Sequence, residues 1–244
     1  MDTSYFNSRK TVRKYTQEPV AQQLLNEILE AAMRAPTCGN MQLYTVIVTR
    51  DPERRKALAE LHFNQPAAAG APLLLTICAD FNRFTRWCEL SGADPGYDNF
   101  LSFTSAMTDA VILAQQIVTI AELRGLGSCY LGTVTYNAPQ ISRLLELPEL
   151  VVPVASLSLG WAAEDPAPVE RLPLEACVCE ETYRKDSDEQ ILNLFKAKDD
   201  FPDNAQYVKE NGKQTLAQVF TDIRYPRSLN ESVSATLLDY LRAQ

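Results

Sequence analysis

The spacing of apolar residues predicts several helices, each with recognisable start or stop signals. Residues 20–34 carry apolar side chains at helical spacing, with Pro19 directly before the run and Pro36 just after it. One apolar face and one polar face indicate an amphipathic helix that packs on a core. Similar patterns predict further helices at 51–61, 103–123, 140–146 and 232–242.

Continuous apolar runs predict the strands. Residues 73–79 are apolar except for one threonine, as expected of a central strand that is covered on both faces. Further strands are predicted at 44–49, 128–132 and 151–159. A small-residue loop is expected at 62–70 and an irregular segment at 81–100. Because helices and strands are mixed without strict alternation, the predicted fold class is α+β.

The predicted helix at 103–123 is apolar nearly all round, which is typical of a helix buried in a core. It is almost long enough to span a membrane, but internal polar residues such as Asp109 and Gln115 favour a protein core. We therefore expect no membrane-spanning segment.

Composition and charge narrow the class of protein. Of the 244 residues, 46% are apolar and 22% charged, as in soluble globular proteins. The net charge of −8 argues against a general nucleic-acid binder, since affinity for a phosphate backbone comes from Lys and Arg. The first residues lack the basic and apolar regions of a signal peptide, so a cytoplasmic protein is expected.

The cysteines do not indicate a metal centre. Six are present, mostly scattered, and His62 is the only histidine available as a partner. The pair Cys177 and Cys179 lacks a dependable ligand spacing, so no metal site is expected. Cys78 and Cys129 fall in apolar strands, where a buried free thiol is the ordinary state.

The composition changes after Pro173, and residues 183–230 are mostly polar. We interpret residues 1–182 as the domain that carries the candidate site. Residues 183–244 are interpreted as an extension that wraps the body or a partner subunit, because they lack the apolar content of a separate core.

Residues 8–15 form a basic cluster in an otherwise acidic chain, since four of the eight are Arg or Lys. Arginine can hold a phosphate through a bidentate fork, and lysine adds a point charge. The cluster predicts an anion site for a cofactor phosphate. The alternative is an ordinary solvated surface.

No set of side chains in the sequence supplies acid–base or nucleophilic chemistry. Neither the dinucleotide-binding glycine fingerprint nor a P-loop is present. Cys38 is a candidate nucleophile, but a single histidine gives no Cys–His pattern, which disfavours a cysteine hydrolase. No catalytic side chain is therefore assigned, and the chemistry is expected to come from a bound cofactor.

Several short motifs occur in order between residues 5 and 185. They are RKTVRKY at 9–15, APTCGNMQ at 35–42, ADFNR at 79–83, GLGSCYLG at 125–132, LELP at 145–148, LGW at 159–161 and RLP at 171–173. Their order and spacing together resemble the FMN-dependent nitroreductase family. The nearest resemblance is to the branch with the oxygen-insensitive major nitroreductase and flavin reductases of that type.

The resemblance implies an architecture. It is a central mixed or antiparallel sheet flanked by helices, in an entwined homodimer with two FMN sites at the subunit interface. The helix at 103–123 would be the central dimer helix.

The resemblance also implies which residues contact FMN. The phosphate and ribityl chain would be held by Arg9, Lys10, Thr11 and Arg13, with Arg171 reaching back to the phosphate. The isoalloxazine ring would lie along Thr37, Cys38 and Gly39, with Gln65 at its polar edge. The side near its reactive nitrogen would be lined by Tyr130, Leu131 and Gly132.

Two positions in the body depart from the pattern of this branch. Val169 stands where a lysine is usual, so phosphate binding would depend more strongly on the basic cluster. Gly39 and Asn40 stand where the branch is serine-rich, which would change the substrate pocket.

A third departure lies in the tail. Gln214 and Thr215 occupy the place where an arginine for the NADPH 2′-phosphate is expected. The nearby cations Lys213, Arg224 and Arg227 are candidate substitutes. The preference between NADH and NADPH therefore stays open.

The activity that the resemblance implies is hydride transfer from NAD(P)H to FMN and then to an acceptor that enters after the nicotinamide leaves. The expected acceptors are nitroaromatics, quinones or free flavin. Two alternatives remain, namely a specialised flavin enzyme such as a dehalogenase and an FMN-binding protein without fast NAD(P)H turnover. No nucleic-acid or membrane partner is expected.

Overall fold

The computed structural model describes residues 3–244, which divide into two compact units. The sheet unit consists of Thr11–Pro166 and Thr236–Gln244. The C-terminal unit consists of residues 3–10 and Ala167–Ala235. All four named strands belong to the sheet unit, whereas the C-terminal unit is built from helices.

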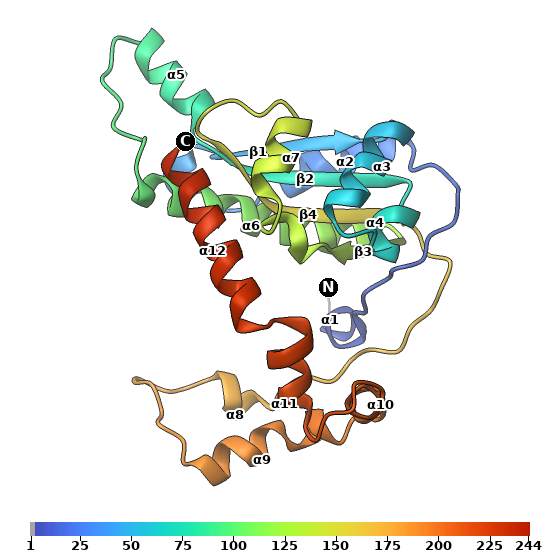
Figure 1. The fold of residues 1–244 in the computed structure, drawn as a ribbon. Helices are drawn as coiled ribbons and strands as arrows, with labels where there is room; N and C mark the ends of the chain where they lie inside the picture. The colour runs from blue at the N-terminus through green and yellow to red at the C-terminus, as the bar shows by residue number, and fades with distance from the viewer. Residues whose placement is uncertain (1–2) are drawn as a thin grey trace. The chain divides into compact units, whose positions relative to one another are not determined.

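Four strands form one antiparallel sheet in the order β1-β2-β4-β3 (Figure 1). Their bounds are β1 Tyr44–Thr49, β2 Leu73–Asp80, β3 Leu126–Tyr130 and β4 Val151–Trp161. Every residue of β2 is buried, as its apolar run predicts for a central strand. The strand predicted at 128–132 begins earlier, because the chain already turns at Gly125, whose φ of +86° is accessible to glycine. The α+β class is confirmed, and the sheet is antiparallel.

The helices of the sheet unit fall mostly where the apolar spacing predicts them. They are α2 (Gln22–Ala32), α3 (Pro52–Leu61), α4 (Pro66–Gly70), α5 (Asn82–Leu90), α6 (Phe100–Leu123) and α7 (Ala138–Leu144). Two turns of 3-10 helix, η1 (Cys38–Asn40) and η2 (Gly132–Val134), lie between them. The last turns of α12 (Arg227–Arg242) also belong to this unit, and the Tyr240 hydroxyl lies 2.5 Å from the Ser142 hydroxyl of α7.

Two predictions about irregular segments are wrong. The loop expected at 62–70 contains α4, which begins at Pro66, a residue that fits the first turn of a helix. The segment expected to be irregular at 81–100 contains α5. Its apolar residues Phe84, Trp87 and Cys88 do have helical spacing, but the turn residues that follow at 92–96 led to the prediction of an irregular segment.

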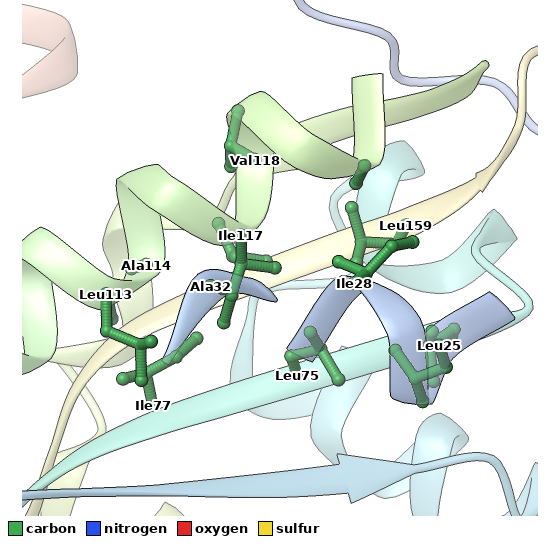
Figure 2. Packing of buried hydrophobic residues seen from close by; sticks show 14 of the residues in the cluster. Leu25, Ile28, Ala32, Leu75, Ile77, Leu113, Ala114, Ile117, Val118 and Leu159 are labelled. Atoms are coloured by element: carbon green, nitrogen blue, oxygen red, sulfur yellow. The ribbon is translucent and has the colours of Figure 1, made fainter. Parts of the chain in front are cut away.

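The main core lies between the sheet and helices α2 and α6. Figure 2 shows Leu25 and Ile28 of α2, Leu75 of β2 and Ile117 of α6, which belong to one buried apolar cluster. All four side chains are fully buried. Burial of a large apolar side chain contributes about 1.5–3 kcal/mol, so this layer fixes α6 firmly to the sheet.

A second cluster covers the opposite face of the sheet, beneath α3, α4 and α7. It includes Leu58 of α3, Ala67 of α4 and Ile141 of α7, together with Leu74 of β2. Successive residues of a strand point to opposite faces, which is why Leu74 and Leu75 belong to different clusters. The sheet is therefore covered by helices on both sides.

Helix α6 is buried along one side only. Leu113 and Ile117 face the core, whereas Phe100, Leu101 and Val111 are 69%, 76% and 45% exposed. The prediction of a helix buried all round is therefore wrong for the chain by itself. By length and composition α6 could cross a membrane, but its packing on the sheet is that of a core helix.

The C-terminal unit is a set of short helices and the start of α12. The helices are α1 (Ser4–Ser8), α8 (Leu174–Cys177), α9 (Asp188–Asp199), α10 (Pro202–Glu210), α11 (Leu216–Val219) and a π-helical turn, η3 (Phe220–Arg224). Glu170 joins two of them, because its carboxylate accepts from Lys198 Nζ at 2.9 Å and from Asn204 Nδ2 at 3.1 Å. The domain boundary between residues 182 and 183 stays a prediction.

Candidate functional site

Residues 11–13 of the basic cluster run along the edge strand β3. The Val12 N–H donates to the Ser128 carbonyl oxygen at 3.0 Å. A Cβ at Gly127 would lie 2.7 Å from Val12 Cβ, so this close approach requires glycine. Val12 is buried, whereas its neighbours Thr11 and Arg13 keep exposed surface.

The backbone of Arg13 is held by a hydrogen bond, and its side chain is exposed. Its N–H donates to Glu164 Oε1 at 2.6 Å, and the Lys14 N–H donates to the same oxygen at 3.1 Å. Among residues 3–244, no hydrogen bond or ion pair holds the Arg13 guanidinium. This cation is therefore available to an anionic ligand.

Gln65 is presented by a strained turn after α3. Phe63 and Asn64 have φ values of +57° and +51°, a left-handed conformation that costs a non-glycine residue roughly 1–2 kcal/mol. The Asn64 N–H closes the turn by donating to the Ala59 carbonyl at 2.8 Å. Gln65 then stands half-buried directly before Pro66, the first residue of α4. Such strain is typical of segments that hold a functional residue in place.

The predicted ring contacts Tyr130, Leu131 and Gly132 follow one another at the end of β3. Leu131 is buried, and its N–H donates to the Ser156 carbonyl at 2.9 Å. Tyr130 and Gly132 are exposed on either side of it. No atom lies within 4 Å of the position that a Gly132 Cβ would take, so the backbone here is open to a ligand.

Two loops, residues 61–65 and 131–137, are fastened together beside these residues. His62 Nδ1 lies 2.8 Å from Thr133 Oγ1, and Gln65 Nε2 donates to the same oxygen at 3.5 Å. Sequence reasoning did not identify His62 or Thr133 as residues of the site. The only signal was that His62 is the one histidine of the chain.

The buried His62 makes the stability of the fold depend on pH. Desolvation by burial lowers the pKa of its imidazole from about 6.5 to about 4. Between these values the unfolded chain binds a proton that the folded chain does not, so the free energy of unfolding falls as the pH drops. We expect a loss of about 3 kcal/mol from this group between pH 6.5 and pH 4.

Urea unfolding over this pH range measures the effect, with His62→Gln as the variant that cannot titrate. The stability curves of the natural protein and the variant should converge towards pH 4. Parallel curves would show that His62 is protonated equally in both states.

The second group of predicted site residues is held by Asp109, a buried residue of α6. Its carboxylate accepts hydrogen bonds from the Thr37 hydroxyl, from the Cys38 N–H at 2.8 Å and from the Leu43 N–H at 3.2 Å. Gly39 turns the loop with a φ of +55°. The sequence showed Asp109 only as a polar interruption of an apolar helix, so its role in holding this loop was missed.

Cys38 is not placed for nucleophilic chemistry. A hydrogen bond with Asp109 and, to a smaller extent, burial raise the pKa of the Cys38 thiol. Since the thiolate is the reactive form, a thiol held protonated is a poor nucleophile. This agrees with the interpretation of the sequence, in which no cysteine hydrolase is favoured.

The predicted site residues of the sheet unit form two groups that lie far apart in one chain. The first group lies beside β3 and includes Tyr130, Leu131 and Gly132, and the second is the loop at 37–43. Tyr130 is level with Leu75 of β2, whereas the loop at 37–43 leads into Tyr44, which is level with Ala79. Four residues along a strand and three strand spacings across the sheet give a separation of roughly 20 Å. The groups also lie on opposite faces of the sheet, because the first belongs with the cluster under α4 and α7 and the second with α6.

The remaining predicted phosphate contacts, Arg9, Lys10 and Arg171, belong to the C-terminal unit. That these three residues contact the FMN phosphate stays a prediction. The Arg171 guanidinium donates to the carbonyl oxygens of Glu170 at 2.9 Å and Val169 at 3.4 Å. The side chain of Val169 is 56% exposed and supplies no charge.

All three tail cations already have partners inside the C-terminal unit. Lys213 Nζ lies 2.8 Å from a carboxylate oxygen of Asp222. The Arg224 guanidinium stacks over the Tyr207 ring at 4.8 Å. Arg227 is largely exposed, and its guanidinium lies 3.9 Å from a carboxylate oxygen of Glu231. Any role of Lys213 or Arg224 in binding a nucleotide phosphate would have to compete with these contacts.

Comparison with known proteins agrees with the geometry. The model of the Nitroreductase family matches residues 7–161. An FMN reductase (NAD(P)H) from Bacillus subtilis (strain 168) is 36% identical over 225 residues, which cover 89% of this chain and 90% of the relative. An oxygen-insensitive NADPH nitroreductase from Salmonella typhimurium is 31% identical over 235 residues, or 96% and 93% of the two chains. A crystal structure from Bacteroides fragilis NCTC 9343 has a TM-score of 0.97 at 48% identity and covers 100% of this chain and 98% of its own.

Proposed function

The chain belongs to the nitroreductase family, and we propose that it passes hydride from NAD(P)H, through bound FMN, to a nitroaromatic compound, a quinone or free flavin. It is an NAD(P)H-dependent FMN oxidoreductase, as its relatives named FMN reductase and NADPH nitroreductase are. One observation carries this conclusion. The family match over residues 7–161 includes every predicted site residue of the sheet unit.

The residues beside β3 suit a flavin mononucleotide. The exposed Arg13 guanidinium can hold a phosphate through two parallel hydrogen bonds, and the Thr11 hydroxyl can donate a further one. The open backbone at Gly132 leaves room for a planar ring, and the Gln65 amide offers a donor and an acceptor to its polar edge. When bound, the flavin supplies the redox chemistry, and these residues bind and orient it.

The separation of the two groups supports a homodimer with shared sites. Tyr130 and the start of β1, into which the loop at 37–43 leads, are roughly 20 Å apart, and the two groups lie on opposite faces of the sheet, which is too far for both to line one ring system in a single chain. In a twofold dimer, the loop at 37–43 of one subunit can complete the site beside β3 of the other. The exposed apolar side of α6, with Phe100 and Leu101, offers the surface that such a dimer would bury.

We propose that residues 183–244 are an extension that wraps the body or a partner subunit and that the protein is cytoplasmic. Large apolar side chains in the C-terminal unit support the first point, because Tyr183 and Leu192 are 88% and 71% exposed.

Replacing Arg13 should weaken FMN binding far more than replacing its neighbour. A charge-assisted bidentate bond contributes about 1.5–3 kcal/mol, so Arg13→Ala should raise the Kd for FMN about 10- to 100-fold. Lys14→Ala should change it less than about twofold, because a surface charge beyond the contact set acts only through screened electrostatics. Fluorescence titration with FMN measures both values. Equal losses from the two variants would remove Arg13 from the phosphate site.

A second candidate function is an FMN-binding protein without fast NAD(P)H turnover. The partners of Lys213 and Arg224 favour it, since those cations are already engaged by Asp222 and Tyr207. Steady-state oxidation of NADH and NADPH with a quinone acceptor separates the two. Turnover with either nucleotide supports the oxidoreductase, whereas FMN binding without turnover supports the second candidate.

A further inference from the structure

His62 lies at the end of α3 with its side chain fully buried. Its Nδ1 faces Thr133 Oγ1 at 2.8 Å. Its Nε2 is shielded from solvent and has no hydrogen-bond partner among residues 3–244. Burial lowers the pKa of this imidazole to about 4, so the ring is neutral near pH 7 and carries one N–H.

The unpartnered Nε2 decides which nitrogen carries the proton. In native proteins a buried N–H without an acceptor is rarer than a buried acceptor with an unused lone pair. The tautomer assigned from this hydrogen-bond network has its proton on Nδ1. His62 therefore donates to Thr133 Oγ1.

With this tautomer, Thr133 Oγ1 accepts two hydrogen bonds. One comes from His62 Nδ1 at 2.8 Å and the other from Gln65 Nε2 at 3.5 Å. A hydroxyl oxygen has two lone pairs, so both are engaged. The proton of the Thr133 hydroxyl is left to point away from both donors, and the side chain is half-exposed.

Further contacts hold the two loops in this arrangement. Asn137 Nδ2 donates to the Leu61 carbonyl oxygen at 2.6 Å. The Phe63 ring meets the Tyr136 ring edge-on, with centroids 6.3 Å apart. These contacts hold the two loops together and so keep His62 beside Thr133.

We propose that Thr133 is a pre-oriented hydroxyl donor to the ring system bound beside Tyr130, Leu131 and Gly132, and that His62 is the positioning residue that sets its direction. This rests on the proposed function, because it takes those three residues to line the flavin ring. A fixed donor stabilises the form of a ligand that carries more negative charge. Thr133 should therefore favour reduced FMN over oxidised FMN.

The proton position can be tested without flavin. The full-length protein is labelled with 15N-histidine, and the single histidine gives one pair of ring-nitrogen signals. The expected spectrum at pH 7 has a protonated Nδ1 and an unprotonated Nε2, and Thr133→Val shifts the Nδ1 signal. A proton on Nε2 would mean that Thr133 donates to His62, and the proposal would be wrong.

The effect on the cofactor is tested by the Kd values for oxidised and for reduced FMN. The preference for reduced FMN is the Kd for oxidised FMN divided by the Kd for reduced FMN, and Thr133→Val should lower this ratio about tenfold. A tenfold change corresponds to a shift of about 30 mV in the potential of a two-electron couple. Thr133→Ser, which keeps the hydroxyl, should retain the preference. The control Thr135→Val changes a hydroxyl on the same turn, which lies 3.5 Å from the Gly132 carbonyl oxygen, and should leave the preference unchanged.

The two experiments separate failure of the proposal from failure of the proposed function. An unchanged preference in Thr133→Val, with FMN still bound, overturns the donor role and leaves the flavin assignment intact. If the natural protein binds no FMN, the flavin assignment fails and the contact with the ring fails with it. The tautomer measurement then still decides whether His62 directs the Thr133 proton.

Discussion

A heterodimer of two variants that each fail to bind FMN is expected to bind one FMN per dimer. In Gly132→Trp the indole covers the open backbone beside β3, where a new side chain meets no neighbouring atom. In Gly39→Trp it covers the loop held by Asp109. Each variant alone blocks both sites of its homodimer, because every site needs the region beside β3 from one subunit and the loop at 37–43 from the other.

In the heterodimer one site receives both tryptophans and the other receives neither. Binding should therefore return in about half of the sites, which is the consequence of twofold symmetry. Two affinity tags select the heterodimer after co-expression, and FMN absorbance per protein gives the stoichiometry.

The matched control for this experiment is Gly92→Trp. Gly92 also has a positive φ, of +76°, so Gly92→Trp reproduces the backbone strain of Gly39→Trp at a residue outside the predicted FMN contacts. Binding of two FMN by the control dimer shows that the added tryptophan is tolerated. A heterodimer without any FMN would show that the two groups do not complete each other across subunits.

The second large effect is expected at Asp109. Replacement by alanine removes the acceptor for the Thr37 hydroxyl and for the N–H groups of Cys38 and Leu43. A buried donor left without a partner costs about 1–3 kcal/mol. The Leu43 N–H is buried and the two donors of Thr37 and Cys38 are partly buried, so Asp109→Ala should lower the free energy of unfolding by about 3 kcal/mol. The loop at 37–43 should also lose its shape, and FMN binding with it.

Urea unfolding measures the first effect and FMN titration the second. Asp109→Asn keeps one acceptor oxygen and should lose less stability than Asp109→Ala. Lys56→Ala is the surface control, since Lys56 is exposed on α3 and does not lie on the side of α6 proposed to be covered in the dimer. A loss below about 1 kcal/mol in Asp109→Ala would mean that water satisfies these donors and that the loop does not depend on the carboxylate.

Most of the sheet could be predicted because its strands are runs of buried apolar residues. The apolar run that contains Leu75 and Ile77 indicates β2 without any knowledge of its neighbours. The order and register of the strands depend on contacts between distant segments, and single-sequence patterns do not specify them. Helix α5 was missed although Phe84, Trp87 and Cys88 have helical spacing, because the glycines and proline at 92–96 indicate an irregular segment that the prediction extended over it. The exposed side of α6 was missed because an apolar sequence does not reveal what covers it.

The candidate site could be predicted as residues but not as an arrangement. The resemblance supplied Arg13, Gln65, Gly132 and the loop at 37–39, and the structure divides the residues of the sheet unit into two groups roughly 20 Å apart. The supporting residues were not predictable, because Asp109 is one acid in an apolar helix and His62 is one histidine in a loop. Their roles arise only when the chain folds and brings Cys38 to the first and Thr133 to the second.

The visible spectrum of the purified protein, reconstituted with FMN and titrated with NADH and NADPH in the absence of oxygen, tests the central claim most directly. The account predicts the absorption of an oxidised, protein-bound flavin, bleaching on addition of a reduced nicotinamide and return of colour when a quinone is added. A protein that stays colourless with added FMN, or a bound flavin that neither nucleotide reduces, would contradict an NAD(P)H-dependent FMN oxidoreductase.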